Sequence, residues 1–467
     1  MNLENIKTVY FIGIGGIGMS GIARYFHSRG ISVHGYDKTS TVLTRTLESE
    51  GMTIHYEDNV SLIPQNIDLA VWTPAIKDLR ELDFLKENNI PLKKRAEVLG
   101  IISQGMKCVA IGGTHGKTTT SSLTAHLLKV GGLDNVAFLG GIAENYGSNY
   151  IAGKGEWVVV EADEFDRSFL WLHPDIAVVT SMDADHLDIY GTDEEIKKSF
   201  NLFANQTKAG GTVYTKPELP LVVDKEGVAK EFYTLDIQLD MIPVKDLSPL
   251  AKDRELLIMG TNLRAERGYF VFDFESPLGN YETLQYTQPG GHNVENATVA
   301  VAIAQQLGVT EEKIREGLKT FKGIRRRFDF IVQNEKVVYI DDYAHHPTEL
   351  NAAISSARML YPNKKILGVF QPHLYTRTRD FQEGFAESLD KLDEILLMDI
   401  YPARELPIEG VTSDIVFSKM KNKNKQRVTK ENLMEILKTR EYDVILTLGA
   451  GDIDVFVQPI AEFLMNN

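Results

Sequence analysis

Short apolar runs alternate with helix-compatible stretches through most of the chain. Runs this continuous, with little polar alternation, are typical of strands buried on both faces, as in parallel sheets covered by helices. We expect a helix at residues 16–28 and strands at residues 8–12, 31–36, 68–72, 107–111, 157–161, 176–180, 337–340, 366–370, 394–398 and 443–448. Residues 255–288 differ, because apolar and polar residues alternate there and turns interrupt the stretch. This pattern predicts an antiparallel excursion. The pattern predicts an α/β protein.

Two glycine-rich turns between a strand and a helix occur at residues 13–18 and 112–116. Each would normally open its own α/β unit, which places a domain boundary near residues 103–107. A new strand series follows Gly323. We therefore expect three domains, at residues 1–104, 105–323 and 324–467, as a chain of 467 residues suggests.

Composition excludes several classes of protein. Hydrophobic residues make up 43% and charged residues 25%, as in soluble globular proteins, and no apolar run reaches the ~18–20 residues of a membrane helix. The start of the chain shows no secretory signal, and the single cysteine, Cys108, cannot form an internal disulfide, so we expect a cytoplasmic protein. A net charge of −15 disfavours nucleic acid binding, and we interpret the basic run at residues 419–427 as a solvated surface loop.

The first glycine turn has the pattern G-x-G-x-x-G, at Gly13, Gly15 and Gly18. These glycines permit a tight turn, close approach of a phosphate and close packing of the helix, whose N-terminus attracts a diphosphate. Asp37 follows at the end of the second strand, where the sugar of a nucleotide is often held. The motif by itself does not distinguish a dinucleotide from another nucleotide. The alternative that it is a tight turn that binds no ligand also stays open.

The second glycine turn, with the sequence GTHGKTT at residues 113–119, indicates a phosphate-binding P-loop. Its amides can surround phosphates, Lys117 can neutralise them, and Thr118 can bind Mg²⁺. The spacing departs from the general P-loop pattern, because Gly112 lies one residue closer than the usual first glycine, whose position is occupied by Ile111.

Acidic residues and a histidine follow the next two predicted strands. Glu161 directly follows an apolar run, where it could hold a metal ion against phosphate oxygens, because ligands gather at the carboxyl ends of parallel strands. His186 follows residues 176–180 and could bind a second cation, although a lone histidine there is more often structural.

Three later segments carry polar groups suited to nucleotides. Asn293 and Asn296 share one helix face and could contact a nucleotide or cap the helix. Arg325 to Arg327 form either a solvated face or donors for transferred phosphates. Histidines and carboxylates at residues 341–349 could suggest zinc, but the adjacent pair at 345 and 346 is poorly spaced to converge on one ion, so nucleotide contact is favoured.

Eight motifs in order along the chain resemble those of the Mur ligases. They are GIGGIGMS (13–20), GTHGKTT (113–119), EADEFD (161–166), DHLDIY (185–190), HNVEN (292–296), RRFDF (326–330), DDYAHHPTE (341–349) and QPHLYTRT (371–378). The resemblance covers essentially the whole chain. It implies an N-terminal Rossmann-like domain, a central P-loop ATPase domain with a parallel sheet, and a C-terminal Rossmann-like domain.

The resemblance also implies an activity: ATP-dependent ligation of L-alanine to the carboxylate of UDP-N-acetylmuramate through an acyl phosphate, in cytoplasmic peptidoglycan precursor synthesis. Two anions must meet in this reaction, so Mg²⁺ (two ions, with Mn²⁺ as an alternative) and cationic side chains are expected. The expected partners are UDP-N-acetylmuramate, L-alanine and ATP, without nucleic acid or membrane, and the protein is expected to be a monomer or homodimer.

The resemblance assigns roles residue by residue. The expected catalytic residues are Lys117, Glu161, His186, Arg326, Arg327 and Asp342, and the metal ligands are Thr118, Glu161 and His186. ATP is expected at Gly113, Thr114, His115, Gly116, Lys117, Thr118, Thr119, Asn293, Asn296 and His345. The sugar nucleotide is expected at Gly15, Gly16, Ile17, Gly18, Met19, Asp37 and Thr73, and the amino acid at His373, Tyr375 and Arg377. Leu374 stands where relatives carry an arginine, which leaves Arg377 to hold the amino-acid carboxylate.

Other readings stay open. A ligase that recycles murein by adding a tripeptide to the same sugar nucleotide is the alternative within the family. An NAD-dependent oxidoreductase would use the first glycine turn and Asp37, but it leaves Lys117 and Glu161 without a role. A nucleotide-binding regulator would need none of the charged groups around the phosphates.

Overall fold

The computed structural model describes residues 3–74, 76, 78–183, 190, 192–239, 256–266, 269–403 and 405–466. The chain forms two compact units. The first comprises residues 1–263, 271–285 and 295–322, and the second comprises residues 264–270, 286–294 and 323–467.

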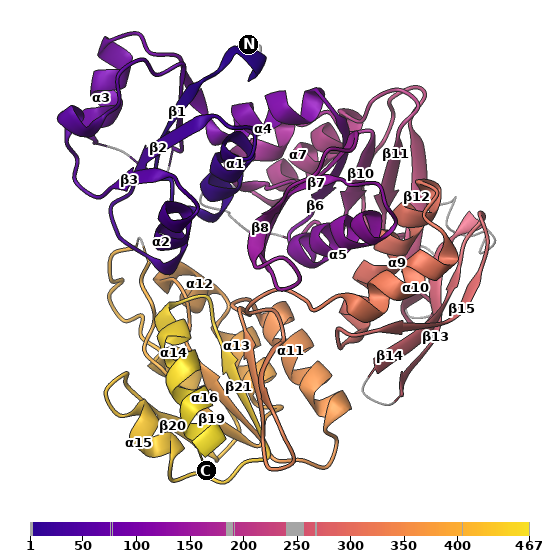
Figure 1. Ribbon diagram of the computed structural model, residues 1–467. Coiled ribbons are helices and arrows are strands. Elements are labelled where there is room, and N and C mark those ends of the chain that lie inside the picture. Colours follow the sequence, from indigo (N-terminus) through magenta and orange to yellow (C-terminus); the bar gives the residue numbers. More distant parts are fainter. Residues whose placement is uncertain are drawn as a thin grey trace. The chain divides into compact units, whose positions relative to one another are not determined.

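The N-terminal part of the first unit contains a five-stranded parallel sheet (Figure 1). Its elements are η1 (Leu3–Asn5), β1 (Thr8–Ile12), α1 (Ile17–His27), β2 (Ser32–Tyr36), α2 (Val42–Ser49), β3 (Thr53–His55), η2 (Val60–Leu62), β4 (Leu69–Trp72), α3 (Arg80–Glu87), β5 (Leu92–Lys94) and α4 (Arg95–Gln104). The strand order is β3-β2-β1-β4-β5. The order reverses at β1, so the glycine turn after β1 lies at the position where such sheets bind ligands.

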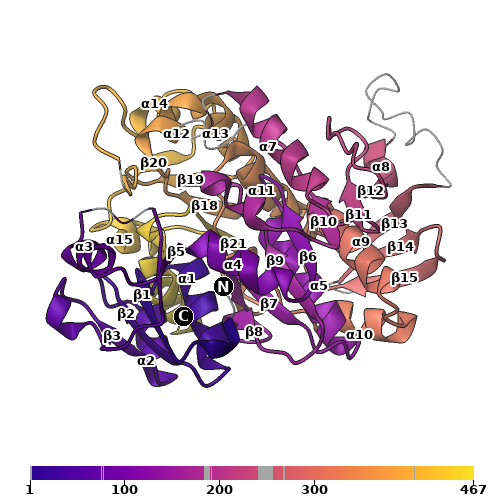
Figure 2. The same cartoon turned by 90° about the horizontal axis from the view of Figure 1, so that it is seen from above.

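The rest of the first unit is built on a ten-stranded sheet of order β15-β14-β13-β12-β11-β10-β6-β9-β7-β8. Its strands are β6 (Lys107–Gly112), β7 (Val136–Ala143), β8 (Ser148–Ile151), β9 (Trp157–Glu161), β10 (Ile176–Val179), β11 (Thr212–Thr215), β12 (Ala229–Leu235), β13 (Ile258–Glu266), β14 (Tyr269–Glu275) and β15 (Tyr281–Tyr286). The helices are α5 (Lys117–Val130), η3 (Phe165–Trp171), α7 (Asp193–Asn205), α8 (Asp236–Leu239), α9 (Gly291–Gln306) and α10 (Glu311–Thr320). Figure 2 shows α5 and α7 on opposite sides of the central strands. Both faces are therefore buried, as the continuous apolar runs predict.

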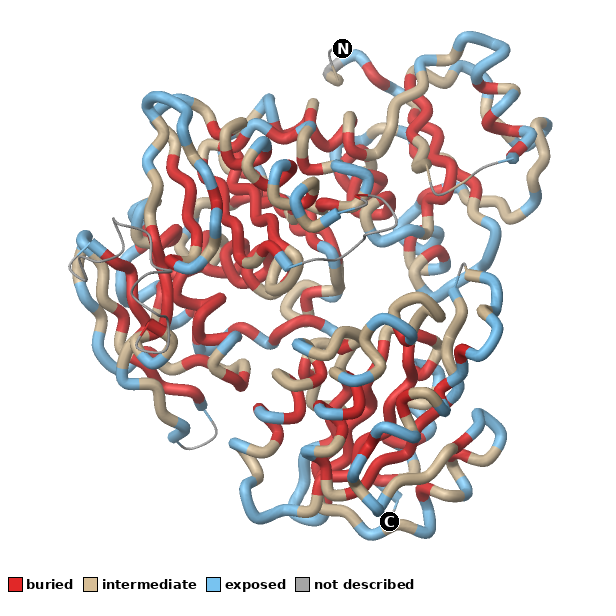
Figure 3. Tube along the Cα trace, turned by 180° about the vertical axis from the view of Figure 1, so that it is seen from behind, coloured by how far each residue is buried: buried red, intermediate tan, exposed pale blue. Residues whose placement is uncertain are grey.

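The second unit contains a six-stranded sheet of order β16-β17-β21-β18-β19-β20, in which only β16 is antiparallel to its neighbour. Its elements are β16 (Asp329–Gln333), β17 (Val338–Asp342), α11 (Pro347–Leu360), β18 (Ile366–Phe370), α12 (Tyr375–Asp380), α13 (Gln382–Leu389), β19 (Glu394–Leu397), α14 (Asp414–Phe417), β20 (Lys425–Arg427), α15 (Leu433–Leu437), β21 (Val444–Leu448), η6 (Asp452–Phe456) and α16 (Val457–Asn466). In Figure 3 the buried residues concentrate in the strands, and the exposed residues lie mainly in the connections.

The predicted α/β class and the predicted strands are confirmed, with shifts of one or two residues at some ends. The strands β13, β14 and β15, within residues 255–288, continue the large sheet beyond β12, with which β13 pairs in parallel. One expectation needs correction. The basic run at residues 419–427 is not wholly a loop, because its last three residues form the edge strand β20, where Arg427 pairs with Asp399 and Asp414.

Helix α1 packs on the β7–β8 hairpin of the larger sheet. Asn149 of β8 accepts a hydrogen bond from Arg24 Nη1 at 2.5 Å and donates to Ser20 Oγ at 3.0 Å. The Tyr25 and Phe138 rings lie 5.7 Å apart beside these polar contacts. The helix that follows the first glycine turn is thereby fixed to the sheet that carries the second turn.

No helix in the described ranges is both long enough and apolar enough to cross a membrane. Cys108 is buried in β6, as expected for a residue inside an apolar strand.

The imidazole of His126, on α5, provides a test of the fold through pH. Its Nδ1 lies 2.9 Å from Tyr146 Oη and its Nε2 lies 3.0 Å from Thr320 Oγ1. Burial lowers the pKa of His126 from 6.5 to about 4. Folding therefore favours the neutral ring, and this stabilisation is present above the unfolded pKa and is lost as the pH falls toward the folded pKa.

We predict that lowering the pH from about 7 to about 5 costs about 2 kcal/mol of unfolding free energy through His126. Other groups titrate in this range, so the measurement is urea unfolding of the wild type and of His126→Gln at both pH values. The variant should lose less stability on acidification by that amount. Equal losses in the two proteins would contradict the assignment.

Candidate active site

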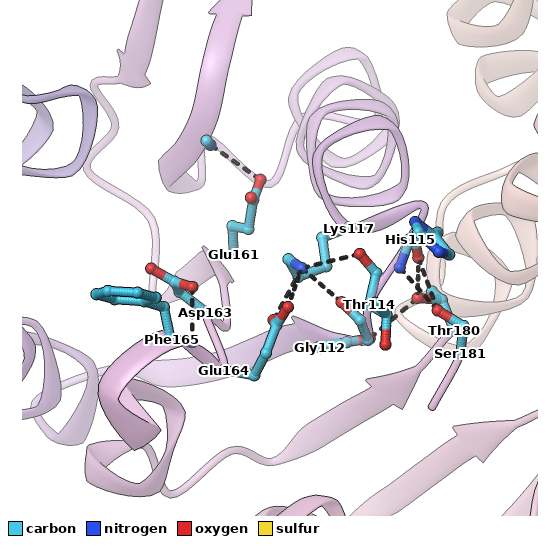
Figure 4. A network of polar contacts seen from close by, with 12 residues as sticks. Gly112, Thr114, His115, Lys117, Glu161, Asp163, Glu164, Phe165, Thr180 and Ser181 are labelled. Carbon is cyan, nitrogen blue, oxygen red and sulfur yellow. Dashed lines mark hydrogen bonds and ion pairs between the residues drawn. The ribbon is translucent and has the colours of Figure 1, made fainter. Parts of the chain in front are cut away.

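The second glycine turn joins β6 to α5 and is anchored by the end of the neighbouring strand β10. Gly113 and Gly116 adopt φ values of +135° and +82°, which side chains with a β-carbon rarely allow. The His115 amide donates to Ser181 Oγ at 2.7 Å, and Thr180 Oγ1 donates to the Gly112 carbonyl at 3.2 Å (Figure 4). The turn is therefore a fixed backbone loop at a helix N-terminus, which suits phosphate binding.

The ammonium of Lys117 points back over this turn and is paired with a carboxylate. Its Nζ lies 2.8 Å and 3.0 Å from the two oxygens of Glu164 and donates to the Gly113 carbonyl at 2.6 Å (Figure 4). Burial acts to lower the pKa of Lys117, but Glu164, Glu161 and Asp163 outweigh it and raise the pKa above its usual value. Lys117 is therefore a firmly charged group at the centre of the turn.

Glu161 and Thr118 are the predicted metal ligands that the structure describes. Glu161 is the last residue of β9, which pairs with β6, and Glu161 lies opposite Ile111 in this pairing. Its Oε2 accepts the Gly140 amide at 2.9 Å, and a β-carbon on Gly140 would lie 2.1 Å from its Oε1. His186 lies outside the described residues, and within the described part of the chain no three His, Cys, Asp or Glu side chains gather into a metal site.

The first glycine turn is held by Asp37. The Gly15 amide donates to Asp37 Oδ2 at 2.8 Å, and the Thr39 amide donates to Asp37 Oδ1 at 3.2 Å. A β-carbon on Gly13 would lie 3.8 Å from the Thr73 methyl group. The structure thus brings Asp37 and Thr73 to the turn.

A cavity of about 380 Å³ opens beside this turn, within the size range of ligand sites. From the first glycine turn and α1 it is lined by Gly13, Gly16, Ile17, Gly18, Met19, Gly21 and Ile22, and from elsewhere by Thr73, Arg95, Leu99, Phe138, Leu139, Gly140, Asn149, Glu161, Asp163 and Phe165. Residues of the first turn and of the β9 end therefore share one cavity.

Arg95 is a functional candidate that the sequence analysis missed. Its Nη2 lies 3.2 Å from Asp163 Oδ2, and a β-carbon on Gly18 would lie 2.8 Å from its Nη1. The only signal in the sequence is its position after β5, a strand of three residues. Asp163 and Glu164 were missed as well, although they lie in the same motif as Glu161.

The two asparagines of α9 have different surroundings. A β-carbon on Gly116 would lie 2.8 Å from Asn296 Oδ1, so Asn296 lies against the P-loop. Asn293 Nδ2 donates to the Pro289 carbonyl at 2.7 Å, which ties it to the start of its own helix. The structure thus brings Asn296 to the second turn.

In the second unit the predicted nucleotide-contacting groups gather at the end of β17. The Asp342 carboxylate accepts the Phe328 and Ala344 amides, each at 2.7 Å, and burial raises its pKa to about 7. Arg327 Nη1 lies 3.8 Å from Glu349 Oε1. His345 donates from Nδ1 to the Tyr343 carbonyl at 2.9 Å, and burial lowers its pKa, with Arg377 and Arg327 adding to the effect.

The residues predicted to bind the amino-acid substrate lie beside this group, after β18. The His373 ring lies 6.0 Å from that of His345 and stacks on Tyr401 at 5.8 Å. Tyr375 and Arg377 lie on α12, whose N-cap, Leu374, has a φ of +68°. Backbone strain of this kind is uncommon in a leucine and concentrates at functional sites.

The chain matches three family models, described as the Mur ligase family catalytic domain at residues 8–107, the Mur ligase middle domain at residues 111–304, and the Mur ligase glutamate ligase domain at residues 326–451. A curated protein of Flavobacterium johnsoniae named UDP-N-acetylmuramate–L-alanine ligase is 49% identical over the full length of both chains. The chain belongs to the Mur ligase family.

Solved structures of Mur ligases have the same fold. A UDP-N-acetylmuramate-alanine ligase from Thermotoga maritima superposes with a TM-score of 0.80 at 26% identity, covering 98% of this chain and 99% of that one. A murein peptide ligase from Psychrobacter arcticus superposes with a TM-score of 0.68 at 20% identity, covering 99% of each chain. The expected resemblance to Mur ligases is thereby confirmed.

We predict that Arg95→Met weakens the binding of UDP-N-acetylmuramate about 10–100-fold, because a diphosphate bound in this cavity would lose a charged hydrogen-bond donor worth ~1.5–3 kcal/mol. Isothermal titration calorimetry measures the affinity. Arg80→Met is the matched control, since Arg80 lies in the same N-terminal part but is 77% exposed and pairs with Asp58. Equal affinities in the two variants would remove Arg95 from the site.

Proposed function

We propose that the protein joins L-alanine to the carboxylate of UDP-N-acetylmuramate and converts ATP to ADP and phosphate, in cytoplasmic peptidoglycan precursor synthesis. One observation carries the proposal: the same short segment after β9 contacts the P-loop lysine through Glu164 and lines the cavity of the first glycine turn through Asp163 and Phe165. The name of the relative at 49% identity supports the choice of substrates.

The reaction needs ATP because a carboxylate is a poor electrophile without a good leaving group. Attack of the muramate carboxylate oxygen on the γ-phosphorus forms an acyl phosphate and releases ADP. The L-alanine amine then attacks the acyl carbon, and phosphate leaves as the amide forms. Lys117 holds the charge of the transferred phosphate, and the first glycine turn holds the diphosphate of the sugar nucleotide.

The groups present fit Mg²⁺. Glu161 Oε1 accepts no hydrogen bond from the described residues, and Thr118 offers a hydroxyl from the first turn of α5. Hard oxygen ligands of this kind suit Mg²⁺, which would screen the negative charge of the phosphates. We assign Thr118 and Glu161 to one ion and His186 to a second.

The second unit contributes the remaining groups in this proposal. Arg327 and His345 contact ATP, and His373, Tyr375 and Arg377 receive the L-alanine carboxylate. The murein-recycling ligase is the second candidate, and the lower identity to the murein peptide ligase, 20%, disfavours it.

The decisive measurement is phosphate release from ATP and Mg²⁺ with UDP-N-acetylmuramate. We predict that release requires both the sugar nucleotide and L-alanine. Release with a tripeptide but not with L-alanine would favour the recycling activity. Oxidation of NADH, or nucleotide binding without turnover, would falsify the ligase assignment.

We also predict that Lys117→Ala lowers turnover at least ~10²–10³-fold, because the transferred phosphate loses its principal cation. Affinity for UDP-N-acetylmuramate should not fall, since that nucleotide lies at the other turn. Lys129→Ala is the matched control, because Lys129 lies at the far end of α5 and pairs with Asp134. If turnover and the affinity for UDP-N-acetylmuramate both collapsed in Lys117→Ala, the assignment of two separate sites would be contradicted.

A further inference from the structure

The segment at residues 161–165, called here the β9 loop, faces two ligand sites at once. Asp163 and Phe165 line the cavity of the first glycine turn. Glu164, between them in the sequence, turns to the P-loop and pairs with Lys117 (Figure 4). Neighbouring side chains of one short segment therefore serve different sites.

The ammonium of Lys117 has no spare donor in this arrangement. It has three N–H groups, and Glu164, the Gly113 carbonyl and the Thr114 carbonyl lie within 3.3 Å of Nζ. A phosphate oxygen can reach Lys117 only by replacing one of these acceptors. Glu164 is the one that carries charge, so it is the acceptor that a phosphate would repel.

Glu164 cannot simply give up Lys117 and stay in place. Its side chain is only 5% exposed, and Asp163 lies beside it. A buried carboxylate without a cation is strongly unfavourable. Phosphate binding at Lys117 therefore requires the Glu164 side chain to move.

The β9 loop is also linked to the cavity of the first glycine turn. Asp163 pairs with Arg95 at 3.2 Å and accepts the Phe165 amide at 3.0 Å. The β9 loop is followed by Asp166 and Arg167, which adopt φ values of +52° and +54°. Two successive left-handed residues are strained, which is typical of a segment with a second arrangement.

We propose that the β9 loop couples the two nucleotide sites: when ATP takes Lys117, Glu164 leaves it, and Asp163 and Phe165 are carried into the arrangement that holds the sugar nucleotide. The inference rests on the proposed function, because it assumes ATP at the second turn and the sugar nucleotide at the first. Glu164 is then a positioning residue. Coupling of this kind is reciprocal, so each ligand tightens the binding of the other by the same factor.

The experiment measures four affinities by calorimetry, with Mg²⁺ and a non-hydrolysable ATP analogue. In the wild type, saturating UDP-N-acetylmuramate should tighten analogue binding at least ~5-fold, the usual lower range of allosteric coupling, and the converse should hold equally. In Glu164→Gln, which lacks the charge but keeps the size, analogue binding without the sugar nucleotide should be about tenfold tighter, and the coupling factor should fall toward one.

Glu156→Gln is the matched control. Glu156 also pairs with a lysine, Lys107 at 2.8 Å, but it is 64% exposed and precedes the start of β9. This variant should keep the coupling and the alanine-dependent release of phosphate of the wild type. A loss of coupling in Glu156→Gln would overturn the assignment to Glu164.

Two outcomes overturn the coupling while leaving the ligase assignment intact. In the first, the wild-type enzyme is active but binds the two ligands independently. In the second, Glu164→Gln has the same analogue affinity and the same coupling factor as the wild type. Independent binding in the wild type overturns the coupling even if the variant does not fold. Failure of the proposed function has a different signature, since no L-alanine-dependent phosphate would then appear in the wild type.

Discussion

A lysine that is shielded from water must keep an anion beside it, and this requirement at Lys117 organises the centre of the first unit. Glu164 supplies the anion, so the first turn of α5 is tied to the segment after β9. The site is thus charge-balanced before any phosphate arrives. A triphosphate can compete because it offers several charged oxygens to the same ammonium and to the amides of the turn.

Parallel strands make this arrangement possible, because their carboxyl ends lie along one edge of the sheet. In the larger sheet β6, β9 and β10 are neighbours, and their ends supply the glycine turn, Glu161 and Ser181. In the N-terminal sheet the ends of β2 and β5 lead to Asp37 and Arg95. The packing of α1 on the β7–β8 hairpin then brings the two edges to one cavity.

The sequence alone was sufficient to predict those strands whose burial on both faces requires a run of apolar residues. The run Val158 to Val160 identifies a strand with both faces covered, and Glu161 could be placed at its end for that reason. The strands β3 and β5 were missed because each has three residues and none of these is fully buried. Edge strands of this kind carry no apolar run, and tertiary pairing alone defines them.

The partner of Lys117 could not be predicted for a different reason. Glu161, Asp163 and Glu164 lie within four residues, and strand alternation stops being a guide once the chain leaves β9. The contact between Arg95 and Gly18 depends on the docking of α4 against α1, which no local pattern reports. The metal ligand assigned to His186 stays a prediction, since that residue lies outside the described ranges.

Charge balance also discriminates among the arginines of the second unit. Arg326 donates from Nε to Asp341 at 2.9 Å and from Nη2 to the Gly449 carbonyl at 2.7 Å, and Asp341 is completely buried. If a phosphate drew Arg326 away, Asp341 would be left as an unpaired buried charge. Arg327 is 35% exposed, and its nearest carboxylate, Glu349, is beyond hydrogen-bond distance at 3.8 Å. Binding a phosphate would cost Arg327 little, so Arg327 is the better candidate for phosphate contact and Arg326 is the arginine that holds β17 in place.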